Sequence, residues 1–124
     1  MAKFTYLIQM LAPAGVVQQV IEQTNDATVE MDIAVASATD ALVNVAFPYA
    51  TIKAIALQCD IAATLKTNSS SAPSQTISLT AGVPNMWIYT GPGSNPITVD
   101  VTKIYVTTAA AGTLKIRVLY DPTP

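Results

Sequence analysis

The chain has 124 residues with a net charge of −2, and it contains no histidine. Only 11% of its residues are charged, against about 25% in an average globular domain, while 51% are hydrophobic. Its six lysines and arginines are scattered, so the sequence predicts neither a nucleic-acid partner nor a membrane partner that would need clustered positive charge.

The shortage of charge also bears on the protein's surface. A chain of this length can bury one self-standing core, and we expect a single domain over residues 1–124. A small domain normally covers its large surface with charged groups, so a charge-poor surface predicts burial in an assembly. A monomer covered by Ser, Thr, Asn and Gln is the alternative.

The N-terminal stretch predicts two strands. Residues 3–11 are rich in Phe, Tyr, Ile and Leu and end at the turn signal Ala-Pro-Ala-Gly, which indicates a first strand or an arm over residues 1–11. The apolar residues of 16–23 fit a helical stripe better than a period of two, but β-branched residues dominate and the segment is barely two turns long. We therefore predict a strand, and a turn at residues 24–26 makes the two elements a plausible hairpin.

The next elements follow in short steps. Residues 29–36 alternate between apolar and polar or small side chains, which predicts a half-exposed strand. A turn is expected at residues 37–40, and a strand over residues 42–47 is ended by Pro48.

Residues 52–68 hold the clearest pair of adjoining strand patterns. Apart from Lys53, both faces of the first strand are largely apolar, so we expect both to be covered. Asp60 breaks the apolar run, which resumes over residues 61–66. This break predicts two strands that meet at a tight corner or bulge.

The C-terminal half predicts four more strands, over residues 76–80, 86–90, 100–107 and 113–120. A loop at residues 68–74 precedes them, and a turn at residues 81–82 and loops at 91–96 and 109–112 separate them. Eight to ten short strands without a convincing helix indicate an all-β antiparallel β-sandwich with an N-terminal strand or arm. We favour a jelly-roll-like form, because the count is nearer eight than seven and the cysteine and tryptophan spacing of immunoglobulin domains is absent.

The chemical inventory argues against an enzyme. Without histidine, the commonest general base and metal ligand is missing. The single Cys59 lies in an apolar strand and is expected to be a buried structural thiol. The acidic residues near Asp26 and Asp32 lack the pattern of a calcium loop, so we expect a solvated edge there. We therefore predict no catalytic residue, no cofactor and no metal.

Aromatic and apolar residues supply the candidate interaction site. Trp87, flanked by Tyr89 and followed by a Gly/Pro loop, can serve an interface or the core, because tryptophan buries a large area and keeps a polar group. The predicted protein interface consists of Phe4, Tyr6, Ile8, Trp87, Tyr89 and Pro92.

A strand-and-loop pattern covers roughly the C-terminal two thirds of the chain. It comprises TLKTNSSSAP at residues 64–73, TISLTAGVP at 76–84 with Trp87 after it, VTKIYVT at 101–107 and TLKIRVL at 113–119. This pattern resembles small virion structural proteins of tailed bacteriophages. The resemblance implies a β-sandwich that sits as cement or decoration on a capsid, often as a trimer, or that belongs to the minor tail components.

The resemblance and the composition lead to one expectation of function. A cement protein acts by surface complementarity across several coat subunits and needs no catalytic group. We expect such a protein to lie on the outer capsid surface. Its expected partners are the major capsid protein and copies of itself, with which it forms a C3 homotrimer. Polar residues interrupt the apolar run before residues 12–14, so it does not fit a secretion signal. We therefore predict synthesis in the host cytoplasm.

Two further functions stay open. One is a minor tail, baseplate or tail-fibre component, which would share the fold and the logic of assembly. The other is a carbohydrate-binding β-sandwich module, which the aromatic content of 6% disfavours because sugar platforms need several exposed aromatic rings. In the leading hypothesis, residues 1–11 form an arm that pairs with the edge of a neighbour's sheet by strand addition.

Overall fold

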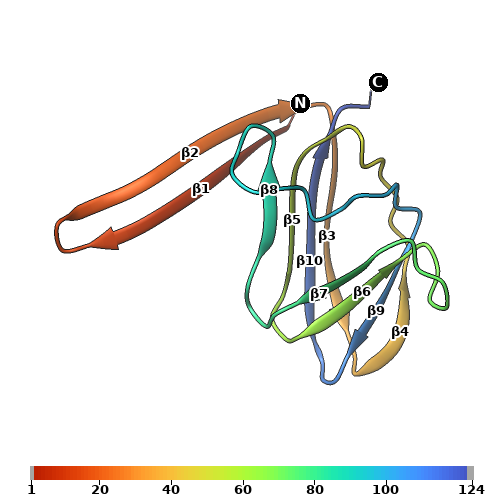
Figure 1. Ribbon diagram of the computed structural model, residues 1–124. Helices are drawn as coiled ribbons and strands as arrows, with labels where there is room; N and C mark the ends of the chain where they lie inside the picture. The colour runs from red at the N-terminus through yellow and green to blue at the C-terminus, as the bar shows by residue number, and fades with distance from the viewer. Residues whose placement is uncertain (1, 123–124) are drawn as a thin grey trace.

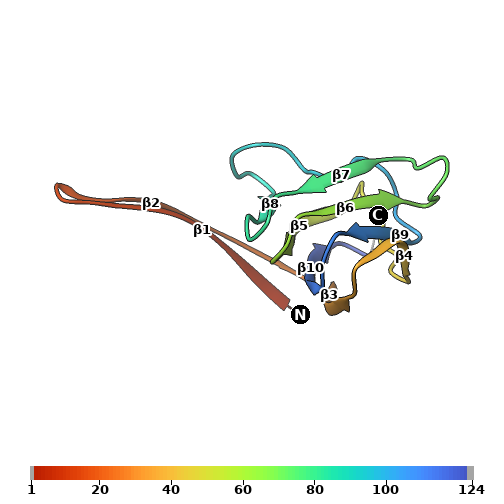
Figure 2. The same cartoon turned by 90° about the horizontal axis from the view of Figure 1, so that it is seen from below.

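Two four-stranded antiparallel sheets pack face to face, and a two-stranded hairpin projects from them (Figures 1 and 2). This computed structural model describes residues 2–122. The predicted all-β antiparallel β-sandwich is confirmed, and no helix long and apolar enough to cross a membrane occurs within those residues.

The first sheet has, in spatial order, β3 (Ala27–Val35), β10 (Gly112–Tyr120), β5 (Ile52–Cys59) and β8 (Asn85–Ile88). The second has β4 (Ala38–Val43), β9 (Ile104–Thr108), β6 (Ala63–Thr67) and β7 (Thr76–Leu79). The pairings are nested along the chain, because β3 pairs with β10, β4 with β9, β5 with β8 and β6 with β7.

The core lies between the two sheets and follows the period of two. Leu57 and Leu65 are fully buried from opposite sheets, and Leu114 and Ile116 of β10 are fully buried beside them. The alternating residues of β3 behave as predicted, since Val29, Met31, Ile33 and Val35 all pack on this cluster. Alternation therefore places one face of each strand inward.

The predicted corner at Asp60 separates strands of different sheets. β5 ends at Cys59, and β6 begins at Ala63 in the facing sheet. The Asp60 carboxylate accepts a hydrogen bond from the backbone N–H of Thr113 at 2.7 Å. This bond ties the crossing to the start of β10.

The predicted turn at residues 37–40 is wrong, because β4 begins at Ala38 and contains a bulge. Asp40 has a φ of 53°, and the register with β9 shifts between Ala38 and Ala41. Two contacts hold Asp40 there: its N–H donates to Thr107 Oγ1 at 3.0 Å, and its carboxylate lies 3.2 Å from Lys66 Nζ. A side chain that bonds across the sheet thus keeps an irregular residue within the strand.

Two predicted strands have wrong bounds. The strand predicted over residues 42–47 lies earlier in the chain and ends at Val43, and the one predicted over 100–107 begins only at Ile104. Between them, Phe47 and Val101 form an isolated bridge with two backbone hydrogen bonds of 3.0 Å. Both side chains are buried. The apolar residues of these two segments therefore indicate contact with the core, although the segments do not form a continuous strand pair.

Leu57→Ala should lower the free energy of unfolding by about 2–5 kcal/mol, because it leaves a cavity in a fully buried site. Leu42→Ala is the matched control, since this side chain is 54% exposed, and it should change stability by no more than about 0.5 kcal/mol. Urea denaturation measures both values. Equal losses in the two variants would contradict the assignment of the core.

Candidate interaction surface on the N-terminal hairpin

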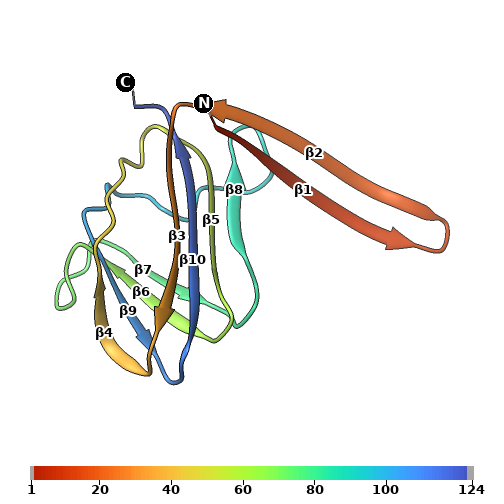
Figure 3. The ribbon, with the colours of Figure 1, turned by 180° about the vertical axis from the view of Figure 1, so that it is seen from behind.

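The projecting element is one long, regular hairpin. β1 (Ala2–Ala12) and β2 (Gly15–Asn25) pair without interruption from Ala2 opposite Asn25 to Ala12 opposite Gly15. Residues 16–23 are therefore a strand, as predicted. The arm contains both strands rather than residues 1–11 alone, and it extends well beyond the sandwich (Figures 1 and 3).

The base of the hairpin packs on the outer face of the first sheet. Phe4, Tyr6 and Ile21 contact the cluster formed by Ala54, Ile88 and Leu119. Gln23 Nε2 also donates a hydrogen bond to the backbone oxygen of Tyr89 at 3.3 Å. This contact covers the second apolar face of β5 and β10, so Ala54 and Leu119 are buried although they point away from the core.

We call the side of the ribbon that carries Phe4 and Tyr6 the inner face, and the opposite side the outer face. Beyond the base, the inner face carries Ile8, Met10 and Val17, and the outer face carries Leu7, Leu11, Val16 and Val20. These side chains are strongly exposed: Met10 is 70%, Leu11 73% and Val17 75% exposed. The distal half of the ribbon is therefore apolar on both faces.

No charged residue interrupts this surface. The run from Phe4 to Ile21 contains no Asp, Glu, Lys or Arg, and Gln9 Nε2 donates a hydrogen bond to Gln18 Oε1 at 2.9 Å. An isolated two-stranded ribbon is marginally stable in water, and a long open edge with apolar faces invites pairing with another chain. An exposed apolar surface of this kind is typical of an interaction site, so the distal ribbon is a candidate for one.

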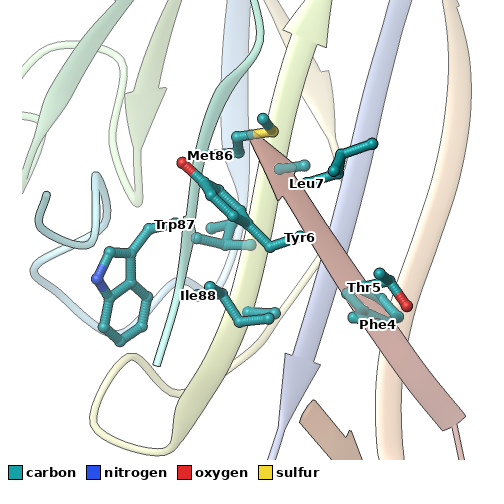
Figure 4. Close-up of a pocket in the computed structure, with 10 residues that line it drawn as sticks. Phe4, Thr5, Tyr6, Leu7, Met86, Trp87 and Ile88 are labelled. Carbon is teal, nitrogen blue, oxygen red and sulfur yellow. The ribbon is translucent and has the colours of Figure 1, made fainter. Parts of the chain in front are cut away.

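An apolar groove lies between β1 and the sandwich (Figure 4). It has a volume of about 290 Å³ and is lined by residues 4–7, 54–56 and 86–88. Met86 lies on the outer face of the sheet beside Ala56, and the Tyr6 side chain extends toward Met86. β1 forms one wall and β2 does not contribute, so the groove follows the edge of β1 that has no strand partner among residues 2–122.

Five of the six predicted interface residues surround the hairpin base and this groove. Phe4 and Tyr6 are half-buried against the chain's own sheet, and Ile8, 40% exposed, begins the projecting half. Trp87 is half-buried and packs against the core, while Tyr89 is exposed with Lys53 Nζ 4.1 Å from its ring centroid. The sixth residue, Pro92, is exposed in the loop after β8.

The distal residues Met10, Leu11, Val16 and Val17 were not among the predicted interface residues. The prediction favoured aromatic residues, and these lie at the base of the hairpin. The signal for the tip was the absence of charge from residues 4–21, combined with apolar residues at both parities of each strand.

The rest of the described chain offers little for catalysis. Cys59 is fully buried and not in a disulfide, and no group of three potential metal-binding side chains occurs in residues 2–122. Asp32, from the acidic cluster, forms an ion pair with Arg117 at 2.7 Å. Comparisons of the chain with protein-family models, curated proteins and solved structures find no match.

Phe4→Ala should loosen the hairpin from the sandwich, because it removes a ring from the contact with Ala54, Ile88 and Leu119. We expect faster hydrogen exchange throughout β1 and β2, and a loss of global stability of only about 1–2 kcal/mol, since the ring is half-buried. Thr5→Ala, one residue along on the outer face, is the control. Unchanged exchange in Phe4→Ala would show that this contact does not hold the ribbon.

Proposed function

We propose that the protein is a structural component of a tailed-bacteriophage virion: a cement or decoration protein that binds the outer capsid surface and stabilises the assembled head. One observation carries the proposal. The hairpin is uncharged from residue 4 to residue 21 and carries exposed apolar side chains on both faces, and its distal half lies away from the sandwich (Figure 2). Such an element is suited to burial in a larger assembly.

The strand order supports a viral structural role. We propose that the sandwich is a jelly roll, and the nested pairing of β3 with β10, β4 with β9, β5 with β8 and β6 with β7 supports this, because one long antiparallel hairpin rolled into two sheets gives the same pairing. Jelly rolls occur in viral capsid proteins, and also in lectins and cupins. The strand order therefore agrees with the proposal without selecting it alone.

The proposed action needs only binding energy. A protein that binds the assembled shell, and not its separate subunits, shifts the equilibrium toward the assembled shell by mass action. In this proposal the major capsid protein contacts the ribbon, and copies of the chain associate as a C3 homotrimer. The net charge of −2 suits the outer surface of a shell better than its DNA-facing lumen.

The carbohydrate-binding alternative gains little support from the described surface. Among residues 2–122, the aromatic side chains counted as strongly exposed are Tyr49 and Tyr89, at 44% and 47%. Tyr89 is already engaged by Lys53, and Trp87 packs against the core. The surface formed by residues 2–122 thus has no platform of stacked, open rings. A tail or baseplate role would use the same hairpin as a head role does.

Shortening the hairpin tests the proposal directly. Replacing residues 9–18 by Asn-Gly joins Ile8 to Gln19, a pair of the same parity as Ala12 and Gly15 at the present turn, so the new turn keeps the strand register. The base contacts stay in place, and the sandwich should keep its stability. Binding to purified heads that lack the protein should be lost, as measured by co-sedimentation and electron microscopy of the particles.

The matched control replaces only Pro13 and Ala14 by Asn-Gly, which changes the turn and keeps the length. This variant should decorate heads at the wild-type occupancy. A shortened chain that still occupies the heads fully would contradict the proposed role of the hairpin. Density for the protein on the tail, with none on the head, would favour the tail alternative.

A further inference from the structure

The strongly exposed large apolar side chains of residues 2–122 gather in two places. Seven lie on the hairpin: Leu7, Ile8, Met10, Leu11, Val16, Val17 and Val20. Three lie along β8 and its flanking turns: Val83, Met86 and Tyr89. The remaining two, Leu42 and Tyr49, belong to neither place, so the hairpin and the β8 side are the two apolar features of this surface.

The groove beside β8 matches the hairpin in chemistry. None of the residues that line it is charged, and its floor combines Ala54, Ala56 and Met86 on the outer face of the sheet. The ribbon is likewise uncharged from residue 4 to residue 21. Docking one into the other buries no ionic group, and it therefore avoids the desolvation cost of an unpaired charge.

The inner face of the ribbon already packs on this same sheet surface. Near the base, Phe4 and Tyr6 contact Ala54 and Ile88 of their own chain. The distal residues of the inner face continue that apolar stripe, but the uninterrupted pairing of β1 with β2 carries them away from their own sandwich (Figure 2). They can reach an equivalent surface only on another molecule.

We propose that the distal inner face, Ile8, Met10 and Val17, docks into the groove beside β8 of a second copy of this chain. The inference deepens the proposed function and rests on it, because it says how the copies of the proposed homotrimer contact one another. The outer face beyond the groove, with Leu11, Val16 and Val20, then stays available for the shell. One ribbon thus serves two partners through its two faces.

Open strand edges at the groove favour the same arrangement. β8 is the last strand of its sheet, and the groove-lining edge of β1 has no strand partner in the described chain. Unpaired backbone N–H and C=O groups on such edges can hydrogen-bond to an incoming strand, which adds direction to apolar packing. A projecting β-hairpin can supply both the apolar side chains and the backbone groups for such a contact.

Sedimentation analysis of the full chain tests the contact. The wild type should be oligomeric, and Val17→Asp and Met86→Asp should each weaken association on the order of a hundredfold, because each places an unpaired carboxylate in the docked interface. Gln18→Asp adds the same charge one residue away on the outer face, and it should leave the oligomer intact. Val17 is 75% and Met86 38% exposed, so both variants should fold, as circular dichroism can verify.

Cross-linking identifies the two surfaces. A Val17→Cys chain mixed with a Met86→Cys chain should give a heterodimer with a short bismaleimide, whereas a Gln18→Cys chain should not; Cys59 is fully buried and does not compete. A monomeric wild type, an intact Val17→Asp oligomer, or cross-links only between two Val17→Cys chains would each overturn the inference.

Binding to heads is scored separately, so the two proposals fail in different ways. A chain that decorates heads but shows none of the expected association overturns the docking inference alone. An oligomer that behaves as expected but does not bind any virion particle overturns the proposed function.

Discussion

The contact between the hairpin base and the outer face of the first sheet determines most of what is distinctive in this molecule. Without Phe4, Tyr6 and Ile21, the outward-facing Ala54 and Leu119 would lie open to water on central strands. The contact also fixes the direction in which the ribbon leaves the sandwich. A small domain thereby holds an apolar element clear of its own surface, and this geometry is what the proposed assembly role depends on.

The ribbon beyond that contact has more apolar surface than it can cover. A two-stranded sheet has no second layer packed on either of its faces. The apolar side chains on both faces must therefore be covered by another part of the chain or by a partner. The sandwich supplies cover only for the base. The proposed division, with the inner face on a second copy and the outer face on the shell, accounts for both faces and for the absence of charge between residues 4 and 21.

The sequence predicted the strands and the sandwich well, because alternation and turn residues are local signals. It also indicated the hairpin, since β-branched residues outweighed the helical spacing of residues 16–23. The bulge at Asp40 could not be predicted, because Thr107 and Lys66, which hold it, come from distant strands. The projecting tip was missed because the aromatic residues directed the prediction to the base of the hairpin, whereas the available signal was the absence of charge from residues 4–21.

The nested strand order has a consequence for biosynthesis. The hairpin closes between Ala2 and Asn25, whereas the outermost pair of the sandwich, β3 with β10, cannot form until the segment up to Tyr120 exists. Local contacts form sooner than distant ones, because long loops close at a greater entropic cost. The apolar ribbon can thus form on the nascent chain before the sandwich that supports it is complete, and exposed apolar surface of this kind is prone to aggregation during folding.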